Sequence, residues 1–467
     1  MEDYRFGKSI IGDIVFDWET GFAYKRDYPK AHIPDKLYYP ASYIIYKENN
    51  RYYAKNGRTG EVEKQDTDAA TVIQYAINNL NAGTVYIKAG TYLISSPITI
   101  NKSAINIIGE GWGTLLKLAN GANCDLIKID SSEQDVYLPQ LMFLHLDGNK
   151  ANNTSGSAIH ASGTNQIYDV LLFHVNTFSF PDNALKAERG HAWRIISCDF
   201  ETCGGDGVYL SNVTNFSFFG CHIGGNTGKG IYVDSANGIN FDKCYVLNNG
   251  GHGIHIYYSY YNYLSNIYVN SNNGDGILLQ GGGRHKLNNI EVESAGQNGI
   301  KIWSASYTKL SNIIIRNASQ SADNTYDGLA ITSAEDIDVS GITVLTTLTN
   351  KPNDAISIDD ASSKVKILIG NLSGYTVNAI RNLATDTKIE HVFGYTNKNS
   401  GTATIPAGST SVTVSHGLVA APSKVLVTPI GDPGDRYWVE NITDTSFDIV
   451  VATAPTADID FYWEAEV

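Results

Sequence analysis

The chain has 467 residues, 42% of them hydrophobic and 18% charged, so it can bury a large core in one elongated domain with smaller additions. Its formal net charge of −14 argues against nucleic acid and anionic membranes as partners, because the overall field would repel both. No run of about 18 apolar residues occurs, so no membrane-spanning helix is expected.

The N-terminal residues 1–60 contain no repeat and are rich in tyrosine. Residues 43–46 and 51–54 flank Glu48-Asn49-Asn50, a pattern typical of a β-hairpin. We expect this segment to serve as a cap, a subunit contact or an attachment segment.

An amphipathic helix is predicted over residues 69–80, with Asp68 as its N-cap. Such a helix can cover the open end of a coil of strands, which would otherwise expose unpaired edges. The first strands of that coil are predicted at 83–94, 98–100, 105–111 and 115–118, where apolar residues alternate with others.

A repeat of 23 residues dominates the centre of the chain. It is marked by glycines at the start of successive short strands, namely Gly207, Gly230, Gly253, Gly276 and Gly299. A second set of strands recurs with the same step, and no helix of ten residues fits between them. The pattern therefore predicts parallel strands stacked about 4.8 Å apart in a coil. Cys198, Cys221 and Cys244 follow the same period and predict a buried ladder of thiols.

Several motifs precede the repeat in a fixed order: Asp66-Thr-Asp68, the predicted helix, Gly83-Thr-Val-Tyr-Ile-Lys-Ala-Gly-Thr-Tyr92 and Ile108-Gly-Glu-Gly111. With them, residues 61–395 resemble the pectate lyase superfamily. This resemblance implies an all-β fold, a right-handed parallel β-helix. The superfamily contains polysaccharide lyases, polygalacturonase-like hydrolases, uronan epimerases and viral tailspikes. The likeness to tailspikes implies a homotrimer and an extracellular or virion-associated location, although Met1–Phe6 lack the basic and apolar regions of a signal peptide.

Two columns of side chains are predicted to line a long groove on the coil. One is formed by the residues just before each repeated strand: Asp125, Ser157, Asn183, Asp206, Lys229, His252, Asp275, Asn298, Asp327, Asp354 and Asn378. The other is formed by outward residues two places into the strand: Lys128, His160, Lys186, Tyr209, Tyr232, His255, Leu278, Lys301, Ala330, Ser357 and Arg381. Larger gaps between repeats mark excursions that can form the walls of the groove.

A structural role competes with a chemical one in the first column. Asn183, Asn298 and Asn378 fit a strand corner, because such side chains satisfy turn amides. Lys229 and His252 are not preferred turn residues. The polygalacturonase-like hydrolases carry an Asp-Gly, a doubled Asp and a Gly-His-Gly at this position. Asp206 and His252 match that pattern, but Lys229 stands where the doubled Asp is expected.

β-Elimination from a uronate fits this column better than hydrolysis. The reaction needs a group that neutralises the carboxylate, a base for the C5 proton and an acid for the leaving oxygen. The candidate catalytic residues span four rungs, or about 14 Å: Asp206, Tyr209, Lys229, Tyr232, His252, His255 and Asp275. The candidate substrate-binding residues are Lys186, Lys301, Trp303, Asp327 and Asp354. Calcium, held by Asp206 and Asp275, is a weak candidate cofactor.

Two other functions stay open. Asp327 and Asp354, one rung apart, have the spacing of a retaining glycosidase pair, and Asp275 lies two rungs, about 10 Å, from Asp327. A non-catalytic adhesin or virion fibre could instead grip sugar with the tyrosines of residues 257–261 and Trp303.

The repeat ends near residue 395, and six short alternating segments over 400–467 predict a small β-sandwich. This module could cap the coil, support trimerisation or bind sugar through Trp438 or Trp463. The overall prediction is a lyase that depolymerises an acidic polysaccharide, with a glycoside hydrolase as the runner-up.

Overall fold

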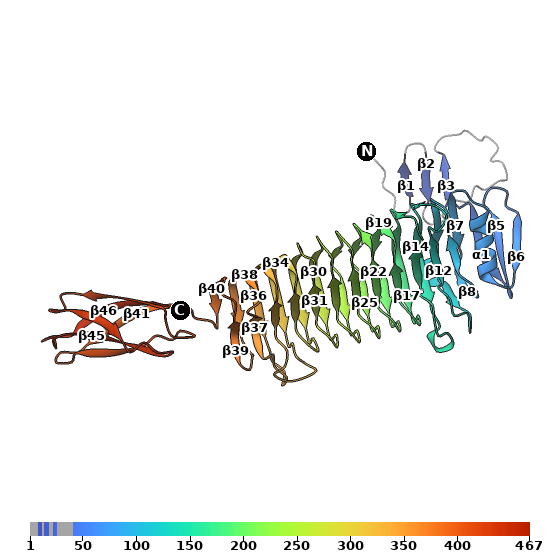
Figure 1. The fold of residues 1–467 in the computed structure, drawn as a ribbon. Helices are drawn as coiled ribbons and strands as arrows, with labels where there is room; N and C mark the ends of the chain where they lie inside the picture. The colour runs from blue at the N-terminus through green and yellow to red at the C-terminus, as the bar shows by residue number, and fades with distance from the viewer. Residues whose placement is uncertain (1–7, 12–13, 18–21, 26–40) are drawn as a thin grey trace. The chain divides into compact units, whose positions relative to one another are not determined.

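A computed structural model describes residues 8–11, 14–17, 22–25 and 41–467 (Figure 1). The chain divides into two compact units, Met1–Lys286 and Leu287–Val467, which are described in turn. Strand β32 (Lys286–Glu293) spans the boundary.

The N-terminal hairpin is confirmed. Strand β4 (Tyr43–Glu48) pairs antiparallel with β5 (Arg51–Asn56), which pairs with β6 (Val62–Asp66). A separate three-stranded antiparallel sheet contains β1 (Lys8–Ile11), β2 (Ile14–Asp17) and β3 (Phe22–Lys25).

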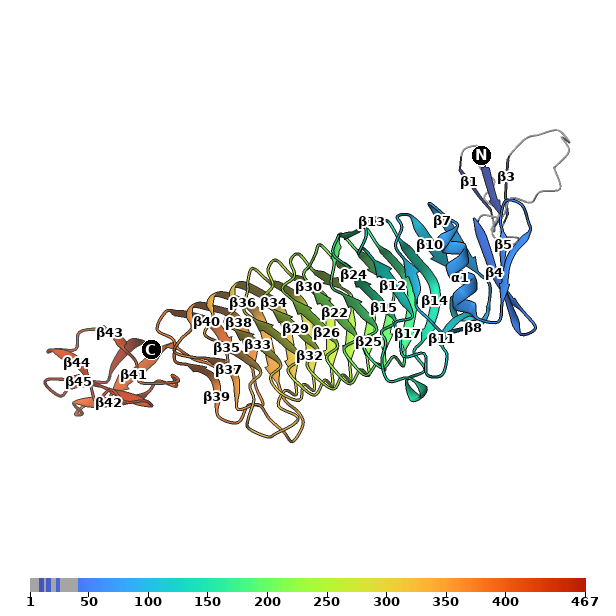
Figure 2. The same cartoon turned by 45° about the vertical axis from the view of Figure 1, so that its right-hand side comes forward.

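The predicted helix forms as α1 (Ala69–Asn78). Asp68 caps it, because a carboxylate oxygen of Asp68 accepts a hydrogen bond of 3.0 Å from the backbone N–H of Thr71. The apolar face, including Val72, Ile73 and Ile77, is fully buried. Figure 2 shows α1 beside β4 and β5, which it contacts together with β8 and β9. The helix therefore covers the apolar edge of the first turns.

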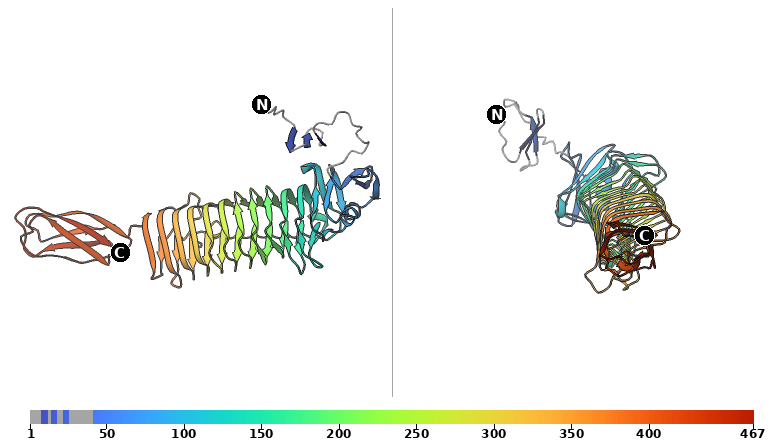
Figure 3. Two further views of the ribbon diagram at one scale, coloured as in Figure 1. Left: turned by 90° about the horizontal axis from the view of Figure 1, so that it is seen from above. Right: turned by 90° about the vertical axis from the view of Figure 1, so that its left-hand side faces the viewer.

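The first unit continues as a coil of parallel strands, seen side by side in Figure 3. Its first sheet contains β9 (Ile98–Ile100), β12 (Ile127–Asp130), β15 (Ile159–Ser162), β18 (Leu185–Ala187), β22 (Val208–Ser211), β26 (Ile231–Asp234), β29 (Ile254–Tyr257) and β31 (Ile277–Gln280). A short third sheet contains β13 (Val136–Tyr137), β16 (Ile167–Tyr168), β19 (Gly190–His191) and β23 (Val213–Thr214). Two 3-10 turns, Gly111–Gly113 and Lys150–Asn152, interrupt the coil.

The second sheet packs behind the first. It contains β7 (Gly83–Ile87), β8 (Gly90–Ile94), β10 (Ile105–Ile108), β11 (Thr114–Leu118), β14 (Gln140–Asp147), β17 (Leu171–Phe178), β20 (Arg194–Ile196), β21 (Asp199–Glu201), β24 (Ser217–Phe219), β25 (His222–Gly224), β27 (Asn240–Asp242), β28 (Tyr245–Leu247) and β30 (Tyr263–Asn270). Cys198, Cys221 and Cys244 are buried between the sheets, as the period predicts. Burial raises the pKa of Cys198, so this thiol stays protonated.

The two glycines of each Gly-x-Gly have separate steric reasons. A Cβ on Gly228 would lie 2.4 Å from Oδ1 of Asp206, one rung earlier. A Cβ on Gly230 would lie 2.5 Å from a methyl carbon of Val246 and 2.6 Å from the carbonyl oxygen of Gly253. The first glycine makes room for a side chain of the preceding rung, and the second lets the strand approach the core.

The second unit contains further rungs and the C-terminal module. Its rungs are built from β33 (Ile300–Trp303), β35 (Leu329–Thr332), β37 (Asp354–Ile358) and β39 (Asn378–Asn382), with β34 (Ser306–Arg316), β36 (Glu335–Leu345), β38 (Ser363–Leu372) and β40 (Thr387–Phe393) in a second parallel sheet. The module consists of two antiparallel sheets, one with β41 (Lys398–Ile405), β46 (Ile459–Glu466) and β43 (Lys424–Ile430), the other with β42 (Ser411–Ser415), β45 (Ser446–Val451) and β44 (Tyr437–Glu440). Phe447, Phe461 and Trp463 belong to the core that these sheets enclose, so the predicted six-stranded sandwich is present.

Candidate functional site

The outward column of the first unit has the predicted register. Lys186 pairs with Tyr209, Tyr209 with Tyr232, and Tyr232 with His255. His255 pairs in turn with Leu278. In the second unit, Lys301, Ala330, Ser357 and Arg381 are aligned in the same way. Parallel pairing thus stacks these side chains along one face of each unit.

The pre-strand column forms a ladder of hydrogen bonds along the corner of the coil. In the following steps the side chain of one rung accepts the backbone N–H of the next. Asp206 N–H donates to Asn183 Oδ1 at 2.7 Å, and Lys229 N–H donates to Asp206 Oδ1 at 2.6 Å. In the second unit, Asp327 N–H donates to Asn298 Oδ1 at 2.9 Å. The corner role predicted for Asn183 and Asn298 is seen, and Asp206 shares it.

Lys229 is the one residue of this column whose side chain has no acceptor atom. It therefore cannot carry the ladder to the next rung. Its ammonium nitrogen lies 4.0 Å from the ring centroid of Tyr232, a cation–π contact. Burial raises the pKa of Tyr232 to about 12, with the charge of Asp234 acting in the same direction, so the phenol keeps its proton at neutral pH.

Two histidines complete the cluster. The rings of Tyr232 and His255 stack with centroids 5.0 Å apart, and those of His255 and His252 meet edge-on at 5.3 Å. Nδ1 of His252 faces the backbone N–H of Asp275 at 2.9 Å and a carboxylate oxygen of Asp275 at 3.4 Å. The shorter contact requires Nδ1 to be an acceptor, so neutral His252 carries its proton on Nε2.

His255 has the same tautomer, but its engaged nitrogen is Nε2. Its Nε2 lies 3.0 Å from Oε1 of Gln280, to which it donates. Nδ1 is then the acceptor, and it is buried without a hydrogen-bond partner. Burial lowers the pKa of His255 to about 4, and the neighbouring His252 and Lys229 reinforce the shift. This imidazole is therefore neutral at pH 7 and has an acceptor nitrogen that is not yet engaged.

Asp206 and Tyr209 flank the cluster. Burial raises the pKa of Asp206, while the hydrogen bond and charge of Lys229 oppose the shift. The rings of Tyr209 and Tyr232 lie edge to face at 5.5 Å. The proposed residues from Asp206 to Asp275 are thus linked by successive contacts on one face.

Residues four places into each strand complete this face, and of these the sequence interpretation included only Tyr257, as a sugar-gripping ring. Ser211, Asp234, Tyr257 and Gln280 pair in register along it. The sequence could have identified them, because in each strand they stand two places beyond the residue of the outward column and therefore point to the same face.

A charged network lies earlier in the first sheet. Nδ1 and Nε2 of His160 contact carboxylate oxygens of Asp125 at 2.7 Å and Glu188 at 3.0 Å. Burial lowers the pKa of His160, but the hydrogen bonds to Asp125 and Glu188 outweigh this effect and raise the pKa above its usual range. Lys186, a predicted substrate-binding residue, has its ammonium 3.0 Å from Oε1 of Glu188. This ion pair neutralises much of the positive charge that Lys186 would otherwise present to a substrate.

The acidic pair of the second unit is tied into the fold. Asp354 has no exposed surface and accepts from Arg381 Nε at 2.6 Å and from Asn378 Nδ2 at 2.8 Å. Asp327 accepts from the hydroxyl of Ser357 at 2.5 Å, and burial raises its pKa. Asp354 is therefore not placed to touch a sugar.

Lys301 and Trp303 lie on β33 of the second unit. The Lys301 ammonium nitrogen is 5.4 Å from the ring centroid of Trp303, which is 42% exposed. An exposed indole beside a cation offers a stacking surface for a sugar.

A shared calcium site for Asp206 and Asp275 conflicts with the geometry. The two residues are three rungs apart, or about 14 Å, whereas calcium ligands lie about 2.3–2.6 Å from the ion. Among the residues that the structure describes, no cluster of three or more His, Cys, Asp or Glu side chains has a metal-binding arrangement. Nor does that part of the chain contain a helix long and apolar enough to cross a membrane.

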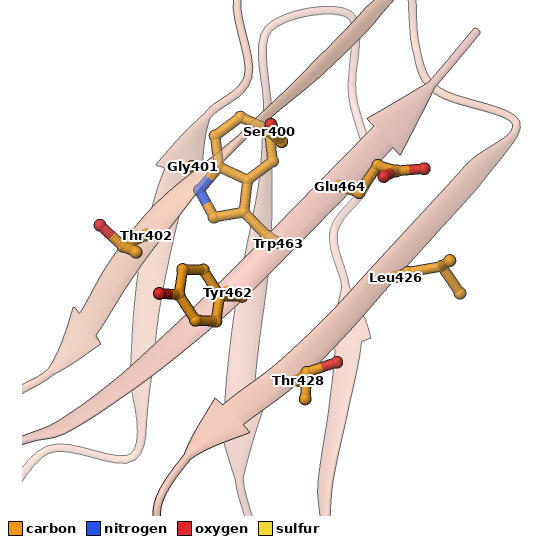
Figure 4. Close-up of a pocket in the computed structure, with 8 residues that line it drawn as sticks. All are labelled: Ser400, Gly401, Thr402, Leu426, Thr428, Tyr462, Trp463 and Glu464. Carbon is orange, nitrogen blue, oxygen red and sulfur yellow. The ribbon is translucent and has the colours of Figure 1, made fainter.

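The C-terminal module has a pocket of about 510 Å³ on the sheet of β41, β46 and β43. Tyr462, Trp463 and Glu464 line it with residues of the two neighbouring strands (Figure 4). Trp463 is only 7% exposed because it packs into the core of the module, whereas Trp438 is 41% exposed. The pocket contains no residue of the cluster on the first sheet.

Comparisons with known proteins agree with the geometry of the coil. A family model described as a right handed beta helix region matches residues 157–319. The chain has a right-handed parallel β-helix fold. No curated protein matches the sequence.

Solved structures with the same fold include enzymes and a viral protein. The A-module of mannuronan C-5 epimerase AlgE6 from Azotobacter vinelandii is 15% identical, with a TM-score of 0.60 over 70% of this chain and 95% of that one. The AlgE4 A-module of the same organism is 16% identical, with a TM-score of 0.59 over 69% and 96%. The Dettilon tailspike protein (gp208) is 11% identical, with a TM-score of 0.50 over 85% and 91%. At such identities the likeness defines the fold alone.

Proposed function

We propose that the chain is a carbohydrate-active enzyme that removes the C5 proton of a uronate in an acidic polysaccharide and cleaves the chain by β-elimination. One observation carries the proposal. Lys229 interrupts a ladder of corner acceptors that it cannot join, and places its ammonium over Tyr232 instead.

The roles follow from the protonation states. Lys229 supplies the positive charge that neutralises the uronate carboxylate, and Nε2–H of His252 is a second donor for it. We assign the role of base to neutral His255, whose Nδ1 is an acceptor without a hydrogen-bond partner; this buried atom has to be uncovered when the substrate binds. Binding of an anionic substrate beside His255 raises its pKa towards a value useful for proton transfer.

Elimination begins when His255 takes the C5 proton. The C5–H electrons form the C4–C5 double bond, and the bond from C4 to the glycosidic oxygen breaks. The phenol of Tyr232, which is protonated at neutral pH, donates its proton to the leaving oxygen. Tyr209 packs against Tyr232 and helps to position it.

C-5 epimerisation is the second candidate. It begins with the same proton abstraction but ends with a proton returned to the opposite face of C5. The two mannuronan C-5 epimerase A-modules, which are matched over nearly their whole length, support it. Hydrolysis by Asp327 and Asp354 is less well supported, because Asp354 is fully buried and held by Arg381. The homotrimer expected from the sequence and an extracellular or virion-associated location, the latter in line with the tailspike match, are further parts of the proposal.

One incubation separates these reactions. The protein is mixed in D₂O with polymannuronate, polyguluronate or polygalacturonate, with and without calcium, and ultraviolet absorbance and NMR spectra are recorded. A rise in the absorbance of unsaturated uronate shows elimination. Deuterium at C5 without that rise shows epimerisation, and new reducing ends alone show hydrolysis. If none of these signals appears across the panel, a non-catalytic adhesin replaces the proposal.

A further inference from the structure

The corner that follows β29 carries an unusual set of exposed rings. Tyr258, Tyr260, Tyr261 and Tyr263 are 56%, 45%, 48% and 38% exposed. Arg284 and Lys286 lie one rung further along. These six residues are called the aromatic corner. Soluble proteins rarely expose so many neighbouring rings unless the surface binds something.

The rings of the aromatic corner are held in place. Cζ of Arg284 lies 5.5 Å from the ring centroid of Tyr261, and Nζ of Lys286 lies 5.2 Å from that of Tyr263. Tyr258 lies flat against Gly281, where a Cβ would come within 2.9 Å of the ring. The backbone of Tyr260, though not its ring, is fixed by bridges to the rungs on either side. Pre-ordered rings lose little entropy when a ligand stacks on them.

The charge around the aromatic corner differs from that of the whole chain. The sequence has 48 acidic residues, but between positions 257 and 286 it has only Asp275, which is 3% exposed. Arg284 and Lys286 lie in the same interval, and both place a cation against a ring of the aromatic corner. Guanidinium and ammonium groups pair with carboxylates, and tyrosine rings stack on the apolar faces of sugars.

The aromatic corner is continuous with the cluster on the first sheet. The ring of Tyr257 lies 4.5 Å from that of Tyr258 and 6.0 Å from that of His255. An unbroken series of rings thus leads from His255 to the exposed corner. A polymer held at the cluster would meet the aromatic corner as its chain extends.

We propose that the aromatic corner is a second polysaccharide-binding surface, which holds an anionic sugar chain without taking part in its chemistry. The uronate nature of the ligand rests on the proposed function. Surface binding of this kind would keep a long polymer near the cluster between reaction events.

Binding to soluble polymers tests this inference. The Tyr260→Ala/Tyr261→Ala/Lys286→Ala variant and the wild type are run on native gels that contain polygalacturonate, alginate or neutral dextran. The control is Lys243→Ala/Tyr245→Ala, which removes an exposed ring and a cation elsewhere on the same unit. We expect the dissociation constant for the acidic polymers to rise about tenfold or more in the corner variant only. Thermal unfolding of each variant verifies that it is folded.

Three outcomes would overturn the inference. They are unchanged binding by the folded corner variant, equal retardation of the wild type by dextran, and a wild-type oligomer that the corner variant dissociates in light scattering. The last result would make a second copy of the chain the occupant. If the polymer binds through the aromatic corner but is not converted, this inference is upheld and the proposed reaction is rejected. The two proposals can therefore fail separately.

Discussion

At the scale of single residues, Lys229 is a position where the contribution to stability and the contribution to activity can be measured separately. Every neighbour in its column can accept the amide of the next rung, and the asparagines at equivalent corners do so. Replacing Lys229 by Asn restores an acceptor and removes the charge. We expect Lys229→Asn to unfold at the same or a higher temperature than the wild type but to lose about 100-fold or more in kcat/KM. A variant that is equally active would show that the ammonium has no part in the reaction.

The protonation of His255 gives a prediction about pH. Its pKa in the free enzyme is about 4, and only the neutral form can take a proton. As the pH falls through about 4, kcat/KM should therefore decrease, and His255→Gln should remove this step along with most of the activity. Circular dichroism at each pH distinguishes loss of activity from loss of fold. An inflection near 6.5 would indicate a different base.

At the scale of strands and turns, the Gly-x-Gly corners give a matched pair of substitutions. A Cβ on Gly228 would lie 2.4 Å from Asp206 Oδ1 and 2.8 Å from the carbonyl oxygen of Gly205, whereas a Cβ on Gly251 would meet nothing closer than 3.1 Å. We expect Gly228→Ala to cost about 1–3 kcal/mol of unfolding free energy and Gly251→Ala much less. Denaturant titration measures both. Equal losses would show that the clash is relieved by movement of the corner.

The same corners show how far the sequence could predict the structure. The constant step of 23 residues set the strand register, so the stacking of Tyr209, Tyr232 and His255 followed directly. The corner role of Asn183 and Asn298 also followed, but the share of Asp206 in the same ladder did not, because it depends on rotamers within each turn. Nor did the burial of Asp354, since its partner Arg381 comes from the next rung and only the folded chain shows their distance.

The His160 network illustrates a further limit. Asp125 and His160 belong to the two columns read from the sequence, but Glu188 lies two places beyond Lys186, just after the end of β18. Spacing alone cannot tell whether a carboxylate and an imidazole pair with each other or with a ligand. The structure shows that His160 and Lys186 already have carboxylate partners. The rungs from Asp206 to Asp275 are therefore the better candidates for the site.

At the scale of the whole molecule, buried histidines should make stability depend on pH. His285 has no exposed surface, and burial lowers its pKa to about 4. The unfolded chain, with a histidine pKa near 6.5, binds more protons between these values. The free energy of unfolding should therefore decrease as the pH falls from about 6.5 to about 4, with roughly 3 kcal/mol from this residue.

Replacing His285 isolates that contribution. Asn262 occupies the neighbouring position one rung earlier and lies 3.4 Å from His285, so His285→Asn puts a residue type that this interior already accommodates in its place. The variant should lose less stability than the wild type between pH 6.5 and pH 4 in urea titrations. An unchanged slope would mean that His285 takes up its proton inside the folded coil, and that the coil is less closed around this column than its burial indicates.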